Sequence, residues 1–81
     1  MDKYNGLLIL RNYGHVEVKL AALLKEHGIT RNRLKELTGT KYEVIDRYYK
    51  ADNVARVDLD FLARVCCVLG CRVEDILEYH E

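Results

Sequence analysis

Apolar side chains recur at helical spacing through most of this 81-residue chain. Leu20, Leu23 and Leu24 follow an i, i+3, i+4 pattern, which places them on one face of a helix. Similar stripes follow, and glycine stands where each of three helices should end, since it readily adopts the left-handed conformation found there. The pattern predicts five short helices between Lys19 and Tyr79, and therefore a mostly α fold.

Side chains that can accept a hydrogen bond from free backbone N–H groups mark two of the helix starts. Thr30 precedes the second helix, in which we expect Leu34 and Leu37 to point inward. Thr40 precedes the third helix, and with Glu43 it forms a T-x-x-E capping box. The third helix is therefore expected over about residues 40–50.

The last two helices are predicted from their apolar stripes. The fourth begins at Asp58 and ends at Gly70, and the fifth is short. The residues expected to face the core are Leu59, Leu62, Cys66 and Leu69 in the fourth helix and Val73, Ile76 and Leu77 in the fifth.

The first eighteen residues show a different pattern. The apolar run Leu7–Leu10 is followed by Asn12-Tyr13-Gly14 and then by His15–Lys19, where polar and apolar residues alternate. Alternation with period two is typical of a strand, and a turn between two such segments predicts a β-hairpin. We therefore divide the chain into an N-terminal extension, residues 1–18, that could serve in dimerisation, and a helical domain, residues 19–81.

The net charge is zero, with 13 basic and 13 acidic residues, but the charges are unevenly distributed. Residues 30–56 carry seven basic and four acidic side chains, a net charge of +3. Residues 57–81 carry two basic and six acidic side chains, a net charge of −4. The positive charge is thus concentrated around the second and third predicted helices.

No arrangement of side chains in the sequence indicates catalysis. The three cysteines, Cys66, Cys67 and Cys71, form neither a C-x-x-C pair nor a complete metal-ligand set. We expect the first two to be small core residues and Cys71 to be partly exposed. The three histidines are far apart in the sequence, and no glycine-rich phosphate loop or nucleophile motif occurs. The sequence therefore predicts no enzyme, no metal, no cofactor and no small-molecule ligand.

The cysteines and the short apolar runs also bear on location. An odd number of cysteines without a secretory leader suits a reducing cytosol. The apolar run Leu7–Leu10 is too short to cross a membrane. We expect a cytoplasmic protein that does not insert into membranes.

Two short helices around Gly39 are typical of a helix-turn-helix motif, whose second helix lies in the DNA major groove. In the third helix, Arg47 or Lys41 could donate to guanine, and Glu43 or Asp46 could accept from the amino group of cytosine. The start of the second helix and the loop after the third offer groups suited to phosphates. The predicted DNA-binding residues are Thr30, Arg31, Asn32, Lys41, Tyr42, Glu43, Asp46, Arg47, Lys50, Asn53 and Arg56.

From about Val18 to Tyr79 the sequence resembles the Cro/phage-repressor type of helix-turn-helix regulators, the XRE-like family. The resemblance is carried by the L-x-x-L-T-G of Leu34–Gly39, by Val44-Ile45, and by the DNVARVDLDFL and CVLGCRVEDILEY segments. It implies a five-helix domain that binds DNA and regulates transcription.

The resemblance also assigns roles to single residues. It places Arg31 at a phosphate- or base-contacting position and Arg56 near a backbone-contacting loop. The recognition positions fall on Lys41, Tyr42, Glu43, Asp46 and Arg47. Two features depart from the family pattern. Lys35 stands where a small residue is usual, and the loop Lys50–Asn53 lacks the common glycine, so that Asn53 could supply its left-handed residue.

We therefore expect a small transcriptional regulator that binds double-stranded DNA as a homodimer, because operators generally contain two half-sites. The N-terminal hairpin is the candidate dimer interface. A protein-interaction module or antitoxin that reuses the same core stays open as the alternative, and the zero net charge favours it. Glu43 is ambiguous, since capping a helix would already explain its presence.

Overall fold

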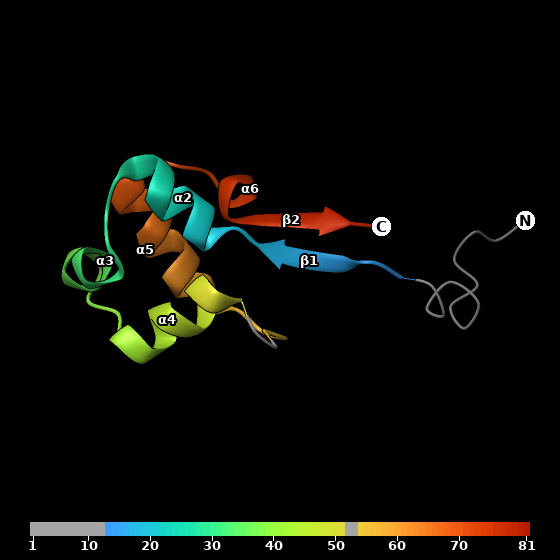
Figure 1. The fold of residues 1–81 in the computed structure, drawn as a ribbon, viewed down its shortest axis with the longest axis horizontal. Coiled ribbons are helices and arrows are strands. Elements are labelled where there is room, and N and C mark those ends of the chain that lie inside the picture. The colour runs from blue at the N-terminus through green and yellow to red at the C-terminus, as the bar shows by residue number, and fades with distance from the viewer. Residues whose placement is uncertain (1–12, 52–53) are drawn as a thin grey trace, which may run out of the picture.

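The computed structural model describes residues 13–51 and 54–81. In these two stretches five helices form a compact body, and two strands form a ribbon that projects from it (Figure 1). The mostly α, five-helix fold predicted from the sequence is confirmed. In chain order the elements are β1 (His15–Val18), α2 (Leu20–His27), α3 (Arg31–Thr38), α4 (Tyr42–Lys50), α5 (Leu59–Leu69), α6 (Val73–Ile76) and β2 (Leu77–His80).

One hydrophobic core holds the five helices together, and each helix contributes to it. Tyr48 stacks at a tilt on Phe61, with ring centroids 4.9 Å apart. The buried polar residue Thr38 donates its hydroxyl hydrogen to the Leu34 carbonyl oxygen at 2.8 Å. The largest fully buried side chains are Leu20, Leu24, Leu34, Ile45, Val65 and Ile76.

The ends of α3 follow the prediction, whereas the start of α4 does not. The Thr30 side chain accepts a hydrogen bond from the Arg33 N–H at 3.1 Å, so Thr30 caps α3. The backbone N–H of Thr40, however, donates to the Thr38 hydroxyl at 3.2 Å. Thr40 thus belongs to the turn that closes α3, and Lys41 is the residue that precedes α4, without a side-chain cap. The predicted capping box of Thr40 with Glu43 is therefore wrong.

The loop after α4 begins with a left-handed residue. Ala51, with φ of 53°, supplies the left-handed residue that ends α4. Asn53, which was expected to do so, lies outside the described residues, as does Asp52.

Four apolar side chains predicted to face the core do not. Leu37 is 39% exposed, Leu59 is 77% exposed and Val73 is 48% exposed. Helix α5 turns Phe61, Leu62 and Val65 inward instead, which leaves Leu59, its first residue, on the outer side. Cys67 is likewise exposed, whereas its neighbour packs partly against the core.

The ribbon consists of β1 and β2, which pair antiparallel from His15 opposite His80 to Val18 opposite Leu77. The predicted strand after Gly14 is thus confirmed as β1. Its partner is β2, a segment predicted to end the fifth helix; α6 instead ends at Ile76. The sequence of β2 alternates like that of β1, and the Lys19 N–H donates to the Ile76 carbonyl at 2.6 Å, which joins the two strands at their base. The expected hairpin arm Leu7–Leu10 lies outside the described residues.

The ribbon forms one end of the molecule, and helices form the other (Figure 1). Helices α3 and α4 lie on the side of the body away from the tip of the ribbon (Figure 1). Within the described stretches, no helix has the length and hydrophobicity that crossing a bilayer requires.

Candidate nucleic-acid interface

Helices α3 and α4 are joined by a tight turn, residues 39–41, that the body holds in place. Gly39 has φ of 71°, a conformation that is costly for residues with a side chain. Arg64 of α5 donates to the Thr38 carbonyl oxygen at 2.7 Å, and Asp60 pairs with Arg64 at 2.8 Å. Because Arg64 of α5 binds the last carbonyl group of α3, the body is tied directly to the start of the turn.

A charged cluster links the start of α3 to the middle and the end of α4. The guanidinium of Arg31, on α3, donates to the carboxylate of Asp46, on α4. Lys50 binds the other carboxylate oxygen of Asp46 at 3.1 Å. Hydrogen bonds from Lys50 and Arg31 hold the pKa of Asp46 below its usual value, so the carboxylate stays charged. The Arg31 guanidinium also lies 4.3 Å from the ring centroid of Tyr49, within the range of a cation–π contact.

This cluster changes the interpretation of two predicted DNA-binding residues. Arg31 and Asp46 are half-buried and paired with each other, so Asp46 is not the freely exposed acceptor that the sequence predicted. Their pairing could not be read from the sequence, because they are 15 residues apart on different helices. Arg31 and Asp46 bring α3 and α4 together.

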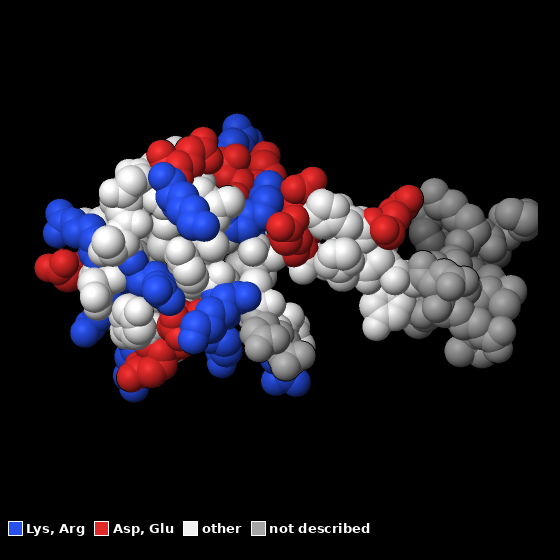
Figure 2. Space-filling model, in the orientation of Figure 1, with Lys and Arg blue, Asp and Glu red and all other residues white. Residues whose placement is uncertain are grey.

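The first turn of α4 presents other predicted residues to solvent. Lys41 and Glu43 are exposed, and Tyr42 between them is half-buried. At the start of α3, Thr30 and Asn32 are exposed as well, although the Thr30 side chain already accepts the capping hydrogen bond. Lys and Arg side chains gather over the α3–α4 side of the molecule and are interrupted by a few acidic groups (Figure 2).

A hollow of about 270 Å³ lies between α4 and the loop that follows it, lined by Arg47 of α4 together with Val54, Ala55 and Arg56 of the loop. The Arg47 guanidinium lies 5.1 Å from the Tyr48 ring centroid and donates to the Tyr48 hydroxyl at 3.4 Å. That contact turns Arg47 toward the 54–58 segment. A concave surface lined by two guanidinium groups suits a phosphate.

Two basic residues of α3 were not among the predicted site residues. Arg33 and Lys35 are both exposed, on the helix that carries Arg31. In the sequence, only their positive charge indicated that they could belong to the site. Lys35, at the position that departs from the family pattern, is exposed, and α3 packs on the core through Leu34.

A family model of the Cro/C1-type helix-turn-helix DNA-binding domain matches residues 19–81. The chain belongs to this family. The match confirms the resemblance found in the sequence, and it spans all five helices. Comparisons of this helix-turn-helix protein with curated proteins and with solved structures found no match.

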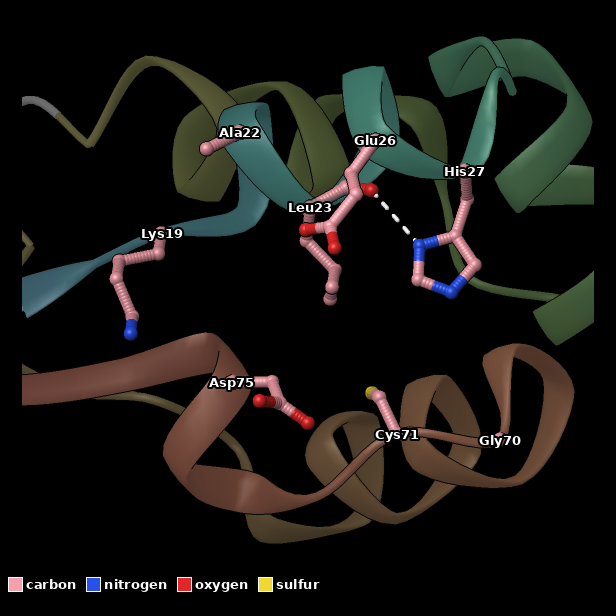
Figure 3. A pocket seen from close by; sticks show the side chains of 8 residues that line it. All are labelled: Lys19, Ala22, Leu23, Glu26, His27, Gly70, Cys71 and Asp75. Atoms are coloured by element: carbon pink, nitrogen blue, oxygen red, sulfur yellow. Dashed lines mark hydrogen bonds between the residues drawn. The ribbon is translucent and has the colours of Figure 1, made fainter.

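A second hollow of the helix-turn-helix protein lies away from α3 and α4, between α2 and the start of α6 (Figure 3). It measures about 250 Å³. Nδ1 of His27 lies 3.0 Å from the Leu23 carbonyl oxygen, so this nitrogen is already engaged. Burial, with Cys66 close by, raises the pKa of the Cys71 thiol to about 11. A thiol that stays protonated is a poor nucleophile and a poor metal ligand.

Proposed function

We propose that this protein is a transcriptional regulator that binds a specific double-stranded DNA sequence with α4 in the major groove. The observation that carries the proposal is the exposed first turn of α4 on a pair of helices whose geometry is fixed. Lys41 and Glu43 have no ion-pair partner among the described residues. They are therefore free to contact base edges without first breaking an internal bond.

The residues divide into three roles under this proposal. Lys41 would donate to guanine, Glu43 would accept from the amino group of cytosine, and Tyr42 would contact the thymine methyl group or the sugar. Groups at the start of α3 and around the arginine hollow would bind phosphates, which fix register without reading sequence. The proposed phosphate contacts are Thr30, Asn32, Arg47, Lys50 and Arg56, and Asn53 stays a prediction.

Arg31 and Asp46 are proposed as positioning residues that hold α4 at its angle to α3. The geometry also favours a phosphate contact for Arg47, because its guanidinium lies against Tyr48 and beside Arg56. The sequence alone suggested that Arg47 reads a guanine. The two roles make different predictions, which are developed in the Discussion.

A homodimer would place two copies of α4 on successive half-sites. We propose that the ribbon forms the dimer interface. Its apolar face exposes Val16 and Tyr79, which are cross-strand partners and are 56% and 57% exposed. Beside them an apolar groove of about 240 Å³ runs to the 54–57 segment. A two-stranded ribbon also has unpaired edges, which readily add a strand from a second copy.

Selection of bound duplexes from a random pool tests DNA recognition directly. We expect one enriched motif, and an affinity for it that falls steeply with rising salt, because binding to phosphates releases counterions. No enriched motif, together with an affinity that does not change with salt, would favour the protein-interaction module instead.

The dimer is tested with a matched pair of charge insertions at exposed apolar positions. Val16→Glu lies on the proposed interface, and Leu59→Glu lies on α5, outside the ribbon strands and the lining of the groove. Sedimentation equilibrium should give a dimer for the natural protein and for Leu59→Glu, and a monomer for Val16→Glu. A dimer that persists in Val16→Glu would exclude the ribbon face.

A further inference from the structure

The polar face of the ribbon brings together four side chains that are far apart in the sequence. Because side chains alternate along a strand, His15 and Glu17 of β1 share one face with Glu78 and His80 of β2. Their cross-strand register places His15 opposite His80 and Glu17 opposite Glu78. The apolar residues of both strands lie on the other face, so this face is separate from the proposed dimer interface.

Two carboxylates directly opposite each other are unfavourable on a sheet, because like charges repel. An imidazole and an ammonium group lie beside these carboxylates. His80 Nε2 lies 2.8 Å from a Glu17 oxygen and 3.9 Å from a Glu78 oxygen, and Lys19 Nζ lies 3.2 Å from Glu78. The imidazole therefore stands between two carboxylates, at the place where a positive charge is most favourable.

We propose that Glu17, Glu78 and His80 bind a first-row divalent cation of the Zn²⁺ type. One ligand atom from each residue lies within 4.8 Å of the other two. Ligand atoms around a tetrahedral zinc with bonds of about 2.0–2.2 Å are about 3.4 Å apart. The observed separations of 2.8 and 3.9 Å lie on either side of that value. Small rotations of exposed side chains are enough to close the site.

The donor set decides the class of metal. One imidazole nitrogen with two carboxylate oxygens suits zinc, nickel or copper, whereas calcium and magnesium prefer oxygen ligands alone. His15 stacks on His80 with ring centroids 5.3 Å apart, so it restrains the His80 ring from one side. Three protein ligands leave a fourth position for water.

Such a metal would join the two strands of the ribbon without contacting α3 or α4. The proposal is therefore independent of the DNA-binding proposal, and each can fail alone. The site could not be predicted from the sequence, because Glu17 and His80 are 63 residues apart and come together only through the pairing of β1 with β2.

The test is calorimetric titration of the full, reduced, metal-free protein with ZnCl₂, followed by thermal melts. We expect one site per chain and a higher Tm with zinc. Glu17→Gln keeps the shape of the side chain and removes its charge, and it should weaken zinc binding by at least about 10-fold, as should His80→Gln. Because Glu17 is exposed, its variant is not expected to unfold, and an unchanged circular dichroism spectrum checks this.

His27→Gln is the matched control, since His27 is an exposed histidine on α2, outside the ribbon. It should bind zinc like the natural protein. The site would be excluded if Glu17→Gln bound zinc with unchanged affinity. A thiolate-to-metal charge-transfer band in the Co²⁺ complex would also overturn the proposal, because it would assign the metal to the cysteines.

Discussion

Replacement of Arg47 and Arg56 by alanine tests whether the hollow between them binds the DNA backbone. Each phosphate contact contributes about 0.9 to the slope of log affinity against log salt concentration. The double variant should therefore lose about 1.8 from this slope for each protomer. When the salt concentration rises fourfold, from 50 to 200 mM, each contact lowers the affinity by about 3.5-fold. The natural protein should therefore lose about 12-fold more affinity per protomer than the double variant over this range.

The assay is fluorescence anisotropy on the selected duplex, on a duplex with one changed base pair, and on an unrelated duplex, at several salt concentrations. The variant should weaken on all three duplexes nearly equally, because phosphates carry no sequence information. Arg72→Ala is the control, since Arg72 is an exposed arginine beside α6 that pairs with Glu74. If the double variant kept the natural salt slope but lost its preference between the first two duplexes, Arg47 would be a base-reading residue and the reasoning would be refuted.

Three further predictions concern the folded domain itself. Ile45→Val removes one buried methylene from a fully enclosed position, so it should cost about 1 kcal/mol and lower the Tm by about 4–8 °C in a thermal melt. Gly39→Ala places a side chain at φ of 71°, which should cost about 1 kcal/mol in urea unfolding; a stabilised variant would contradict this conformation. Because the raised pKa of Cys71 is about 11, its thiolate should be scarce at pH 8 and increase as the pH approaches 11, so iodoacetamide should modify the exposed Cys67 first.

The local features of the fold were largely predictable from the sequence. A helix that ends at a glycine needs only that one residue, so its end can be predicted locally. The cap at Thr30 likewise involves only its own side chain and the first turn of α3. The start of α4 was misplaced because two residues, Thr40 and Lys41, compete for the same turn, and the Thr38 hydroxyl decides between them. The alternation in β2 was present in the sequence but is only four residues long, so the preceding helical pattern concealed it.

Contacts between distant segments could not be predicted. The pairing of Arg31 with Asp46 depends on the angle between two helices, which no local pattern encodes. The hollow between Arg47 and Arg56, and the grouping of Glu17 with Glu78 and His80, depend in the same way on the folded chain. The sequence identified the candidate side chains of the DNA-binding surface, and the fold determines which of them remain free.

The ribbon has a consequence for the order in which the protein folds. Gly14 and Tyr79, hydrogen-bonded at its tip, are 65 residues apart, whereas α2, α3 and α4 follow one another directly along the chain. Closing a loop of that length costs roughly 4 kcal/mol of chain entropy, to be offset by only a few cross-strand contacts. The strands should therefore pair after the helices have assembled and separate before them, and their backbone amides should exchange with deuterium sooner than those of the core. A protein built this way can open one end while the other keeps its shape.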